Sequence, residues 1–169
     1  MKKAALALAA TVLLGLVTAC RSPVPHMIWP QKDMAPAEHY DPSSPRRLLL
    51  ASRASDFKAE LARRLVEELR GDRVYIRGIG VKQLKNAAAN QYQAIVILST
   101  VMARTLDPKV AGFLDKVHDK SRVILLTTSA GGDWLPDKGA YDALTSASRM
   151  DEASRLAAQV AQAVRRRLP

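Results

Sequence analysis

Short apolar runs alternate with amphipathic stretches over most of this chain. Continuous apolar runs occupy residues 48–51, 74–76, 94–98 and 123–126, and a further short strand is predicted at 141–144. Continuous runs of this length are typical of strands buried on both faces. Because segments with helical spacing separate these runs, the pattern predicts an α/β fold, a parallel sheet with helices on both faces.

Four helices are predicted between and after these strands. The first has Ser55 as its N-cap and ends at Gly71, and the second is a short alanine-rich helix over residues 81–90. The third begins at Asp107, and the last opens with a capping box at Ser148. The positions predicted to face the core are Phe57, Leu61, Leu65, Leu69, Val110, Phe113, Leu114, Val117, Leu156, Val160 and Val164.

The first 19 residues follow a different pattern. A short cationic start, Lys2 and Lys3, precedes the apolar stretch 4–19, which ends at Cys20. This layout predicts a secretory signal that is removed. The stretch is too short for a spanning helix, which needs ~20 apolar residues, and no charged stop-transfer cluster follows it.

The residues Val17, Thr18, Ala19 and Cys20 resemble the lipobox of bacterial lipoproteins. The resemblance implies diacylglycerol on the Cys20 sulfur, cleavage before Cys20, and acylation (palmitate) of the new amine, so that membrane lipid is a partner. In that family, Arg21 rather than aspartate after the cysteine implies the outer membrane, with the domain facing the periplasm. The alternative is an ordinary export signal in which Cys20 has no role.

The segment from Cys20 to Pro45 is predicted to link this anchor to a domain over residues 46–169. It holds six of the nine prolines, which favour an extended chain of ~3.1 Å per residue, or roughly 80 Å in all. Two interpretations of residues 27–29, Met-Ile-Trp, remain open: they rest on the membrane interface or pack on the domain.

Composition narrows the classes of partner. The chain has 26 basic and 16 acidic residues, and loss of Lys2 and Lys3 leaves 24 against 16, a net charge of +8. Such a charge favours anionic partners, among them an envelope protein or a cell-wall polymer, whereas export excludes nucleic acid. Cys20 is the single cysteine, so neither a disulfide nor a thiolate metal cluster forms within one chain. No catalytic residue and no metal ligand is predicted.

The strand and helix pattern over residues 46–168 resembles the flavodoxin-like fold, a three-layer α/β architecture with five parallel strands in the order 2-1-3-4-5. The closing strand followed by a long helix carries this resemblance, as do the central runs. One departure is plain: the connection 129–140 has twelve glycine-rich residues, so the usual fourth helix is expected to be absent or reduced to a turn.

In open parallel sheets ligands bind beyond the carboxyl ends of the strands, where the winding direction reverses. Three loops are predicted to meet there. The candidate ligand or partner residues in them are Ser52, Arg53, Ser55, Asp56, Ser99, Thr100, Ser129, Gly131, Gly132, Asp133 and Trp134.

The first of these loops departs from the phosphate loop of flavodoxins, which the resemblance implies would hold FMN. Ser52 matches the family pattern, but Ala54 lacks a hydroxyl, Ser55 replaces a glycine and Phe57 replaces a threonine. Asp56 adds a negative charge that Arg53 offsets, and Trp134 is the aromatic available for one face of a flavin. The Gly131-Gly132 loop suits a turn with Trp134 on the core, or alternatively a recognition loop.

These departures favour a membrane-anchored, non-enzymatic binding or accessory domain without a cofactor, which presents its loops to a protein or a small anionic ligand. The alternative is an FMN-dependent oxidoreductase or electron carrier of the cell envelope. In that alternative Ser52, Arg53 and Ser55 lie at the phosphate and Trp134 lies at the ring.

Overall fold

Five parallel strands form the centre of the fold in the computed structural model, which describes residues 32–136 and 141–168. The sheet order is β3-β2-β4-β6-β7, with neighbouring strands parallel. Counted along the chain this is the order 2-1-3-4-5, as predicted. The strands are β2 (Arg47–Ser52), β3 (Tyr75–Gly80), β4 (Ala94–Met102), β6 (Val123–Thr128) and β7 (Asp142–Ser146).

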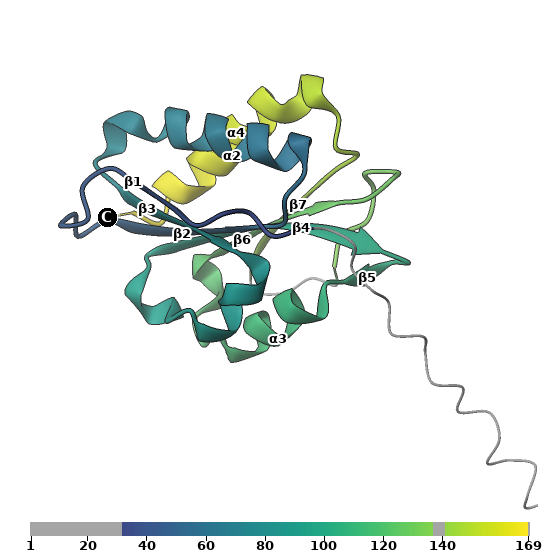
Figure 1. Cartoon of the computed structure of the whole chain (residues 1–169), viewed down its shortest axis with the longest axis horizontal. Helices are drawn as coiled ribbons and strands as arrows, with labels where there is room; N and C mark the ends of the chain where they lie inside the picture. Colours follow the sequence, from purple (N-terminus) through teal and green to yellow (C-terminus); the bar gives the residue numbers. More distant parts are fainter. Residues whose placement is uncertain (1–31, 137–140, 169) are drawn as a thin grey trace, which may run out of the picture. The chain divides into compact units, whose positions relative to one another are not determined.

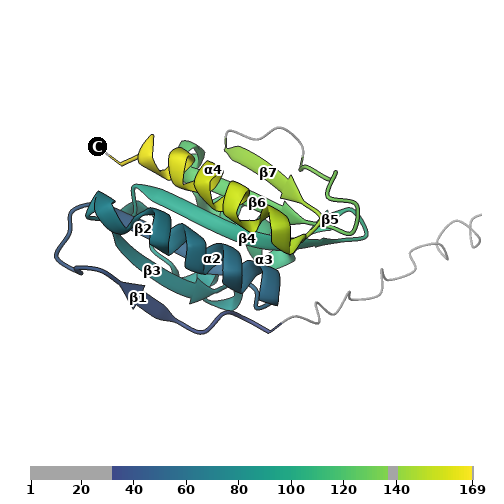
Figure 2. The same ribbon diagram turned by 90° about the horizontal axis from the view of Figure 1, so that it is seen from above.

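Helices cover both faces of this sheet (Figures 1 and 2). On one face α2 (Asp56–Glu68) and α4 (Ala153–Arg165) lie side by side, and on the other α3 (Pro108–Lys116) lies with the 3₁₀ segments η2 (Val81–Asn86) and η3 (Ala89–Gln91). Side chains of β4 alternate between two apolar clusters, Val96 towards α2 and α4 and Ile97 towards α3. The continuous apolar run of β4 therefore follows from burial on both faces.

Two helix predictions need correction. Residues 81–90 form the short 3₁₀ segments η2 and η3 instead of one α-helix. A 3₁₀ helix rises ~2.0 Å per residue against ~1.5 Å for an α-helix, so this short connection spans the length of a strand more easily. Gly71 was predicted to end the first helix, but α2 already ends at Glu68 and Gly71 lies in η1 (Arg70–Asp72). The residue with a left-handed conformation after α2 is Arg73, with φ 52°.

The predicted capping box at Ser148 is absent. Ser148 itself has a left-handed φ of 60°, and its backbone N–H donates to the hydroxyl of Ser146. That hydroxyl in turn donates to Glu152, which precedes α4 directly. A 3₁₀ turn, η5 (Met150–Glu152), leads into α4 instead, so the hydroxyl of Ser146 rather than that of Ser148 organises the entry to the helix.

The predicted start of the domain at Arg46 is too late. Residues 37–39 form β1 (Ala37–His39), which pairs antiparallel with β3, and the Tyr40 hydroxyl donates to the Val66 carbonyl at 2.6 Å. An uncovered β3 would present an unpaired edge, so pairing with β1 satisfies its backbone groups. The stretch between Cys20 and the compact unit that begins at Gln31 is therefore residues 21–30, shorter than the predicted linker.

Residues 31–169 form one compact unit. Both apolar clusters lie in this unit, and so do all strands of the described residues. We therefore expect residues 31–169 to fold without the first 30. The export segment, Cys20, and residues 27–29 lie outside the described residues, so the predictions made for them stay predictions.

The connection after β6 agrees with the expected loss of a helix, since none of its described residues, 129–136, is helical. A short strand, β5 (Thr105–Leu106), turns back against the end of β4 and was not predicted. Within residues 32–136 and 141–168, no helix combines the length and hydropathy needed to cross a membrane.

Candidate functional site

A hollow of about 320 Å³ lies at the carboxyl edge of the sheet, where the sequence predicted a ligand site. It is bounded by the first turn of α2, the ends of β4 and β6, and the loop after β7. We call it the carboxyl-edge hollow. Its lining consists of Ser55, Phe57, Lys58, Thr100, Val101, Thr128, Ser129, Ala130, Ala147 and Ser148.

Lys58 is the residue that gives this hollow its charge. It lies in the first turn of α2, whose N-cap Ser55 accepts a hydrogen bond from the Lys58 backbone N–H at 3.3 Å. The residue is only 2% exposed, and its Nζ donates to Thr100 Oγ1 at 2.8 Å. Burial, with a smaller contribution from the nearby charge of Arg53, lowers the pKa of Lys58 from 10.5 to about 8.

The electrostatic character of the hollow favours an anion. Lys58 is the one ionisable residue among the described residues that line it, and the hydroxyls of Ser55, Thr128 and Ser148 share the lining. The N-terminus of α2 adds the positive end of a helix dipole at the same place. A buried ammonium group beside several hydroxyls and a helix N-terminus has the donor chemistry to bind a phosphate or carboxylate group.

Of the candidate site residues predicted from the sequence, three line the carboxyl-edge hollow: Ser55, Thr100 and Ser129. The hydroxyl of Ser129 accepts a hydrogen bond from the Gly132 backbone N–H at 3.0 Å, which closes the loop after β6. Gly132 has a φ of +68°, and a Cβ there would lie 2.5 Å from the Ala147 backbone nitrogen. Only glycine allows this loop to approach the end of β7 so closely.

The other candidate site residues lie outside the lining. Ser52 and Ser99 are buried, and their hydroxyls donate to the backbone carbonyls of Arg53 and Thr100. Asp56 is exposed at the start of α2. Gly131, Asp133 and Trp134 belong to the loop after β6 but do not line the hollow. The carbonyl of Trp134 accepts a hydrogen bond from the hydroxyl of Thr127 at 3.0 Å.

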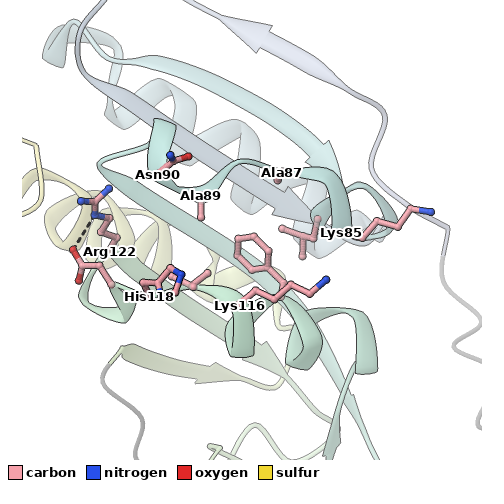
Figure 3. Close-up of a pocket in the computed structure, with 11 residues that line it drawn as sticks. Lys85, Ala87, Ala89, Asn90, Lys116, His118 and Arg122 are labelled. Atoms are coloured by element: carbon pink, nitrogen blue, oxygen red, sulfur yellow. Dashed lines mark hydrogen bonds and ion pairs between the residues drawn. The ribbon is translucent and has the colours of Figure 1, made fainter.

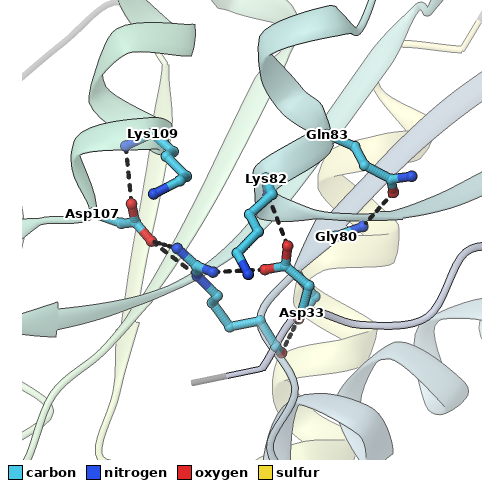
Figure 4. A network of polar contacts seen from close by, with 8 residues as sticks. Asp33, Gly80, Lys82, Gln83, Asp107 and Lys109 are labelled. Carbon is cyan, nitrogen blue, oxygen red and sulfur yellow. Dashed lines mark hydrogen bonds and ion pairs between the residues drawn. The ribbon is translucent and has the colours of Figure 1, made fainter. Parts of the chain in front are cut away.

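Arg53 does not line the hollow and lies in a separate polar network, of which Figure 4 labels the two acidic members, Asp33 and Asp107. The residue is 3% exposed, its Nε donates to Asp107 Oδ2 at 2.9 Å, and its Nη1 donates to Asp33 Oδ1 at 2.7 Å. Asp107 is fully buried and also caps α3, because its Oδ1 accepts from the Lys109 backbone N–H. Two carboxylates therefore neutralise Arg53, which leaves it no role as the predicted phosphate partner in this structure.

The segment around Asp33 also covers the loop that resembles a phosphate loop. The Ala54 backbone N–H donates to the Lys32 carbonyl, and the Met34 N–H donates to the Ser52 carbonyl. Gly80 makes room for this segment, since a Cβ there would lie 2.5 Å from the Cβ of Asp33. The backbone amide of Ala54, which a phosphate loop would offer to its ligand, is thus already bonded within the protein.

The fold resemblance implies FMN, and the carboxyl-edge hollow fits one part of that molecule. Lys58 and the surrounding hydroxyls provide donors for a phosphate group. The aromatic residue of the lining is Phe57, which is only 4% exposed and packs in the core cluster under α2. The described residues therefore fit the phosphate end of a flavin nucleotide, whereas Trp134, the aromatic residue predicted for the ring, is not part of the lining.

Comparisons with known proteins agree with this fold. No protein-family model matches the chain, and no curated protein matches it. An oxidoreductase from Corynebacterium diphtheriae superposes with a TM-score of 0.52 at 12% identity, covering 73% of this chain and 99% of that one. The oxidised flavodoxin 2 from Bacillus cereus gives a TM-score of 0.47 at 13% identity, covering 71% and 98%. The strand order 2-1-3-4-5 with helices on both faces is that of a flavodoxin-like fold, as predicted, and the superposition on the oxidoreductase agrees with it.

Three polar residues of the lining were not predicted from the sequence: Lys58, Thr128 and Ser148. Lys58 carried a usable signal, because it shares the buried face of α2 with Ala62 and Leu65 at helical spacing. A lysine on the apolar stripe of a helix, one turn after a loop at the sheet edge, indicates a buried cation. No local sequence pattern indicates Thr128 or Ser148, because their approach to α2 depends on the sheet order and on the turn after β7.

Proposed function

We propose that the carboxyl-edge hollow binds a phosphate-bearing ligand, and that a flavin nucleotide such as FMN is the first candidate. The single observation that carries the proposal is Lys58, a cation that is 2% exposed in a lining without a carboxylate among the described residues. A phosphate group there would accept a charge-assisted hydrogen bond from this ammonium group and further hydrogen bonds from the hydroxyls beside it.

The flavin candidate draws support from the flavodoxin-like fold, and the oxidoreductase from Corynebacterium diphtheriae shares this fold. When bound, a flavin supplies one- and two-electron redox chemistry. In this proposal Lys58 and Ser55 hold its phosphate, and Thr100 orients the lysine through the 2.8 Å hydrogen bond. The backbone N–H of Ala54, in the loop after β2, already donates to the Lys32 carbonyl. The phosphate would therefore lie nearer α2 than the family pattern implies.

A titration of residues 31–169 with FMN, and separately with inorganic phosphate, tests the proposal. We expect both to bind, FMN more tightly, with a change in the flavin absorption spectrum. Binding of phosphate without binding of FMN would instead identify a non-enzymatic module for another anionic ligand. If neither binds at any concentration that leaves the protein folded, the proposed function is wrong.

The affinity for phosphate ligands should depend on pH through Lys58. Its pKa of about 8 in the folded protein means that the free hollow loses its positive charge as the pH rises through 8, so the affinity should fall by up to about tenfold per pH unit above that value. Below pH ~6 the phosphate of the ligand takes up a proton and loses its second negative charge, so the affinity should also fall at acidic pH. Dissociation constants measured between about pH 5 and pH 10 check this window.

The lowered pKa of Lys58 also affects the stability of the protein without ligand. Because the pKa of Lys58 is lower in the fold than in the unfolded chain, the unfolded state binds more protons between about pH 8 and pH 10.5. The contribution of Lys58 to stability therefore rises with pH across this interval. A Lys58→Arg variant stays charged throughout, so it should show neither the loss of affinity above pH 8 nor the rise in stability between about pH 8 and pH 10.5.

We propose further that the protein is a lipoprotein held at a membrane of the cell envelope, with the flavodoxin-like domain on the periplasmic side. The lipobox-like residues 17–20 and the export signal before them support this proposal. Several acyl chains at ~0.8 kcal/mol per buried methylene would hold the protein stably, whereas one chain alone would bind only marginally.

Replacing Cys20 by serine is expected to abolish lipid labelling and membrane retention, because serine has no thiol to receive diacylglycerol. Metabolic labelling with a fatty acid, followed by fractionation of membranes, measures both effects. A Ser22→Ala variant, which alters a nearby residue outside the lipobox pattern, is the matched control and should be labelled normally. A Cys20→Ser protein that is still processed and still in the membrane fraction would contradict the anchor.

A further inference from the structure

We propose that a second surface, distinct from the carboxyl-edge hollow, docks on the anionic headgroups of a lipid bilayer. It is formed by η2 and α3 on the opposite face of the sheet from α2 and α4. We call it the lysine surface. Its four exposed cations are Lys82, Lys85, Lys109 and Lys116.

The lysine surface follows two adjoining hollows. One, of about 360 Å³, lies against the start of α3 and is lined by all four lysines. The other, of about 330 Å³, continues along η3 towards Arg122. Lys85, Lys116 and Phe113 line both hollows, and Figure 3 shows the two lysines at one end of the second hollow with Arg122 at the other. The cations therefore gather around one continuous depression.

The charge of this surface is uncompensated. Among the described residues none of the four lysine ammonium groups takes part in a hydrogen bond or an ion pair. The acid in the lining of the two hollows is Asp119, which pairs with Arg122 at 2.9 Å. On the α2 face, by contrast, Arg63 and Arg64 both pair with Glu60. Four cations without an acidic partner among the described residues thus lie close together on the η2 and α3 face.

The floor of the depression is apolar, which suits an interface between water and lipid. Leu84, Phe113 and Val117 line it from below, and the lysines rise from its rim. A lysine side chain lays its methylene stem along apolar surface and extends its ammonium group to the level of the headgroups. Each lysine close to an anionic membrane increases binding by about fivefold, so four together give several-hundred-fold.

The position of the tether favours a bilayer over other anionic partners; this step rests on the proposed anchoring at Cys20. The Lys82 backbone N–H donates to Asp33 Oδ2 at 3.0 Å, so the described chain begins beside the lysine surface. The twelve residues from Cys20 to Gln31 extend at most ~40 Å. A domain tethered so closely to a bilayer by a segment that starts at its lysine surface would meet headgroups with that surface.

Vesicle binding by residues 31–169, which carry no acyl group, tests the docking separately from the anchor and from the ligand site. Vesicles of phosphatidylcholine with phosphatidylglycerol are compared with vesicles of phosphatidylcholine alone, and the bound fraction is measured by sedimentation. We expect binding to the anionic vesicles, weakened by added salt, and none to the neutral vesicles. Absence of binding to anionic vesicles overturns the docking proposal and leaves the phosphate-ligand proposal untouched.

Two charge-matched variants decide whether the lysine surface is responsible. The first replaces Lys82, Lys85, Lys109 and Lys116 by glutamine, and the second replaces four exposed arginines elsewhere, Arg63, Arg70, Arg149 and Arg155, by glutamine. We expect the lysine variant to lose binding by about 100-fold or more and the arginine variant to retain most of it. Equal losses would show that only net charge matters and would overturn the proposal.

Chemical labelling of the wild-type protein gives a measurement that depends on no variant. An amine-reactive reagent should modify the four surface lysines more slowly when anionic vesicles are present, while Lys120, which lies outside both hollows, should react at an unchanged rate. Unchanged rates at all lysines would contradict the docking. A soluble acidic polymer such as polyglutamate that binds more tightly than the vesicles would also contradict it.

Discussion

Replacing Asp107 by alanine is expected to lower the free energy of unfolding by about 3–5 kcal/mol, because it leaves the buried Arg53 guanidinium with an incomplete set of partners. Asp107 is fully buried, and its Oδ2 accepts hydrogen bonds from both Nε and Nη2 of Arg53. Its Oδ1 caps α3 at the Lys109 backbone N–H. The alanine variant loses both interactions, and urea unfolding of residues 31–169 measures the change.

Two further variants separate the charge from the cap. Asp107→Asn keeps an oxygen for the Lys109 N–H and should be destabilised less than the alanine variant. Arg53→Met combined with Asp107→Ala removes the buried cation as well, so it should recover part of the stability that Asp107→Ala alone loses. A loss below about 1 kcal/mol in the Asp107→Ala variant would show that water or Asp33 alone satisfies Arg53.

The strands could be predicted because each is an apolar run that must be buried on both faces. Their order followed from the resemblance, together with the rule that crossovers in parallel sheets need a helix-sized connection. β1 was missed since Ala37, Glu38 and His39 show no apolar alternation. It forms because β3 would otherwise expose its edge, which is a property of the assembled sheet rather than of these three residues.

The location of the candidate site was predicted from the sequence, but only some of the residues that line it were. The rule for open parallel sheets located the carboxyl edge, and Ser55, Thr100 and Ser129 do line the hollow there. Arg53 was expected to offset Asp56 beside a phosphate. Its actual partners, Asp33 and Asp107, lie 20 and 54 residues away in the chain. Contacts of that separation depend on the packing of the whole sheet, so no local pattern indicates them.

Arg53 and Lys58 show how the same kind of residue takes two roles at one sheet edge. Both are nearly fully buried cations, and they are five residues apart in the chain. Two carboxylates compensate Arg53, whereas the described lining of the hollow around Lys58 contains hydroxyls and no carboxylate. Arg53 does not line the carboxyl-edge hollow, whereas Lys58 does. Position relative to the hollow therefore indicates which of the two bears on ligand binding.

Replacing Lys58 by methionine should weaken the binding of FMN and of inorganic phosphate by about 10- to 150-fold, the loss of one charge-assisted interaction. Methionine has a similar shape without the charge, so the apolar stem still packs against α2. Since the lowered pKa of Lys58 shows that burial disfavours its charged form, the free energy of unfolding should change by no more than about 1 kcal/mol.

An Arg63→Met variant is the matched control for this experiment, because it removes one positive charge from the same helix at an exposed position outside the hollow. We expect its affinities to stay within about twofold of the wild-type values, since exposed charges at a distance are screened by salt. If Lys58→Met binds both ligands as tightly as Arg63→Met does, the phosphate does not lie against Lys58. A folded Lys58→Met protein that has lost binding would assign the ligand to the carboxyl-edge hollow.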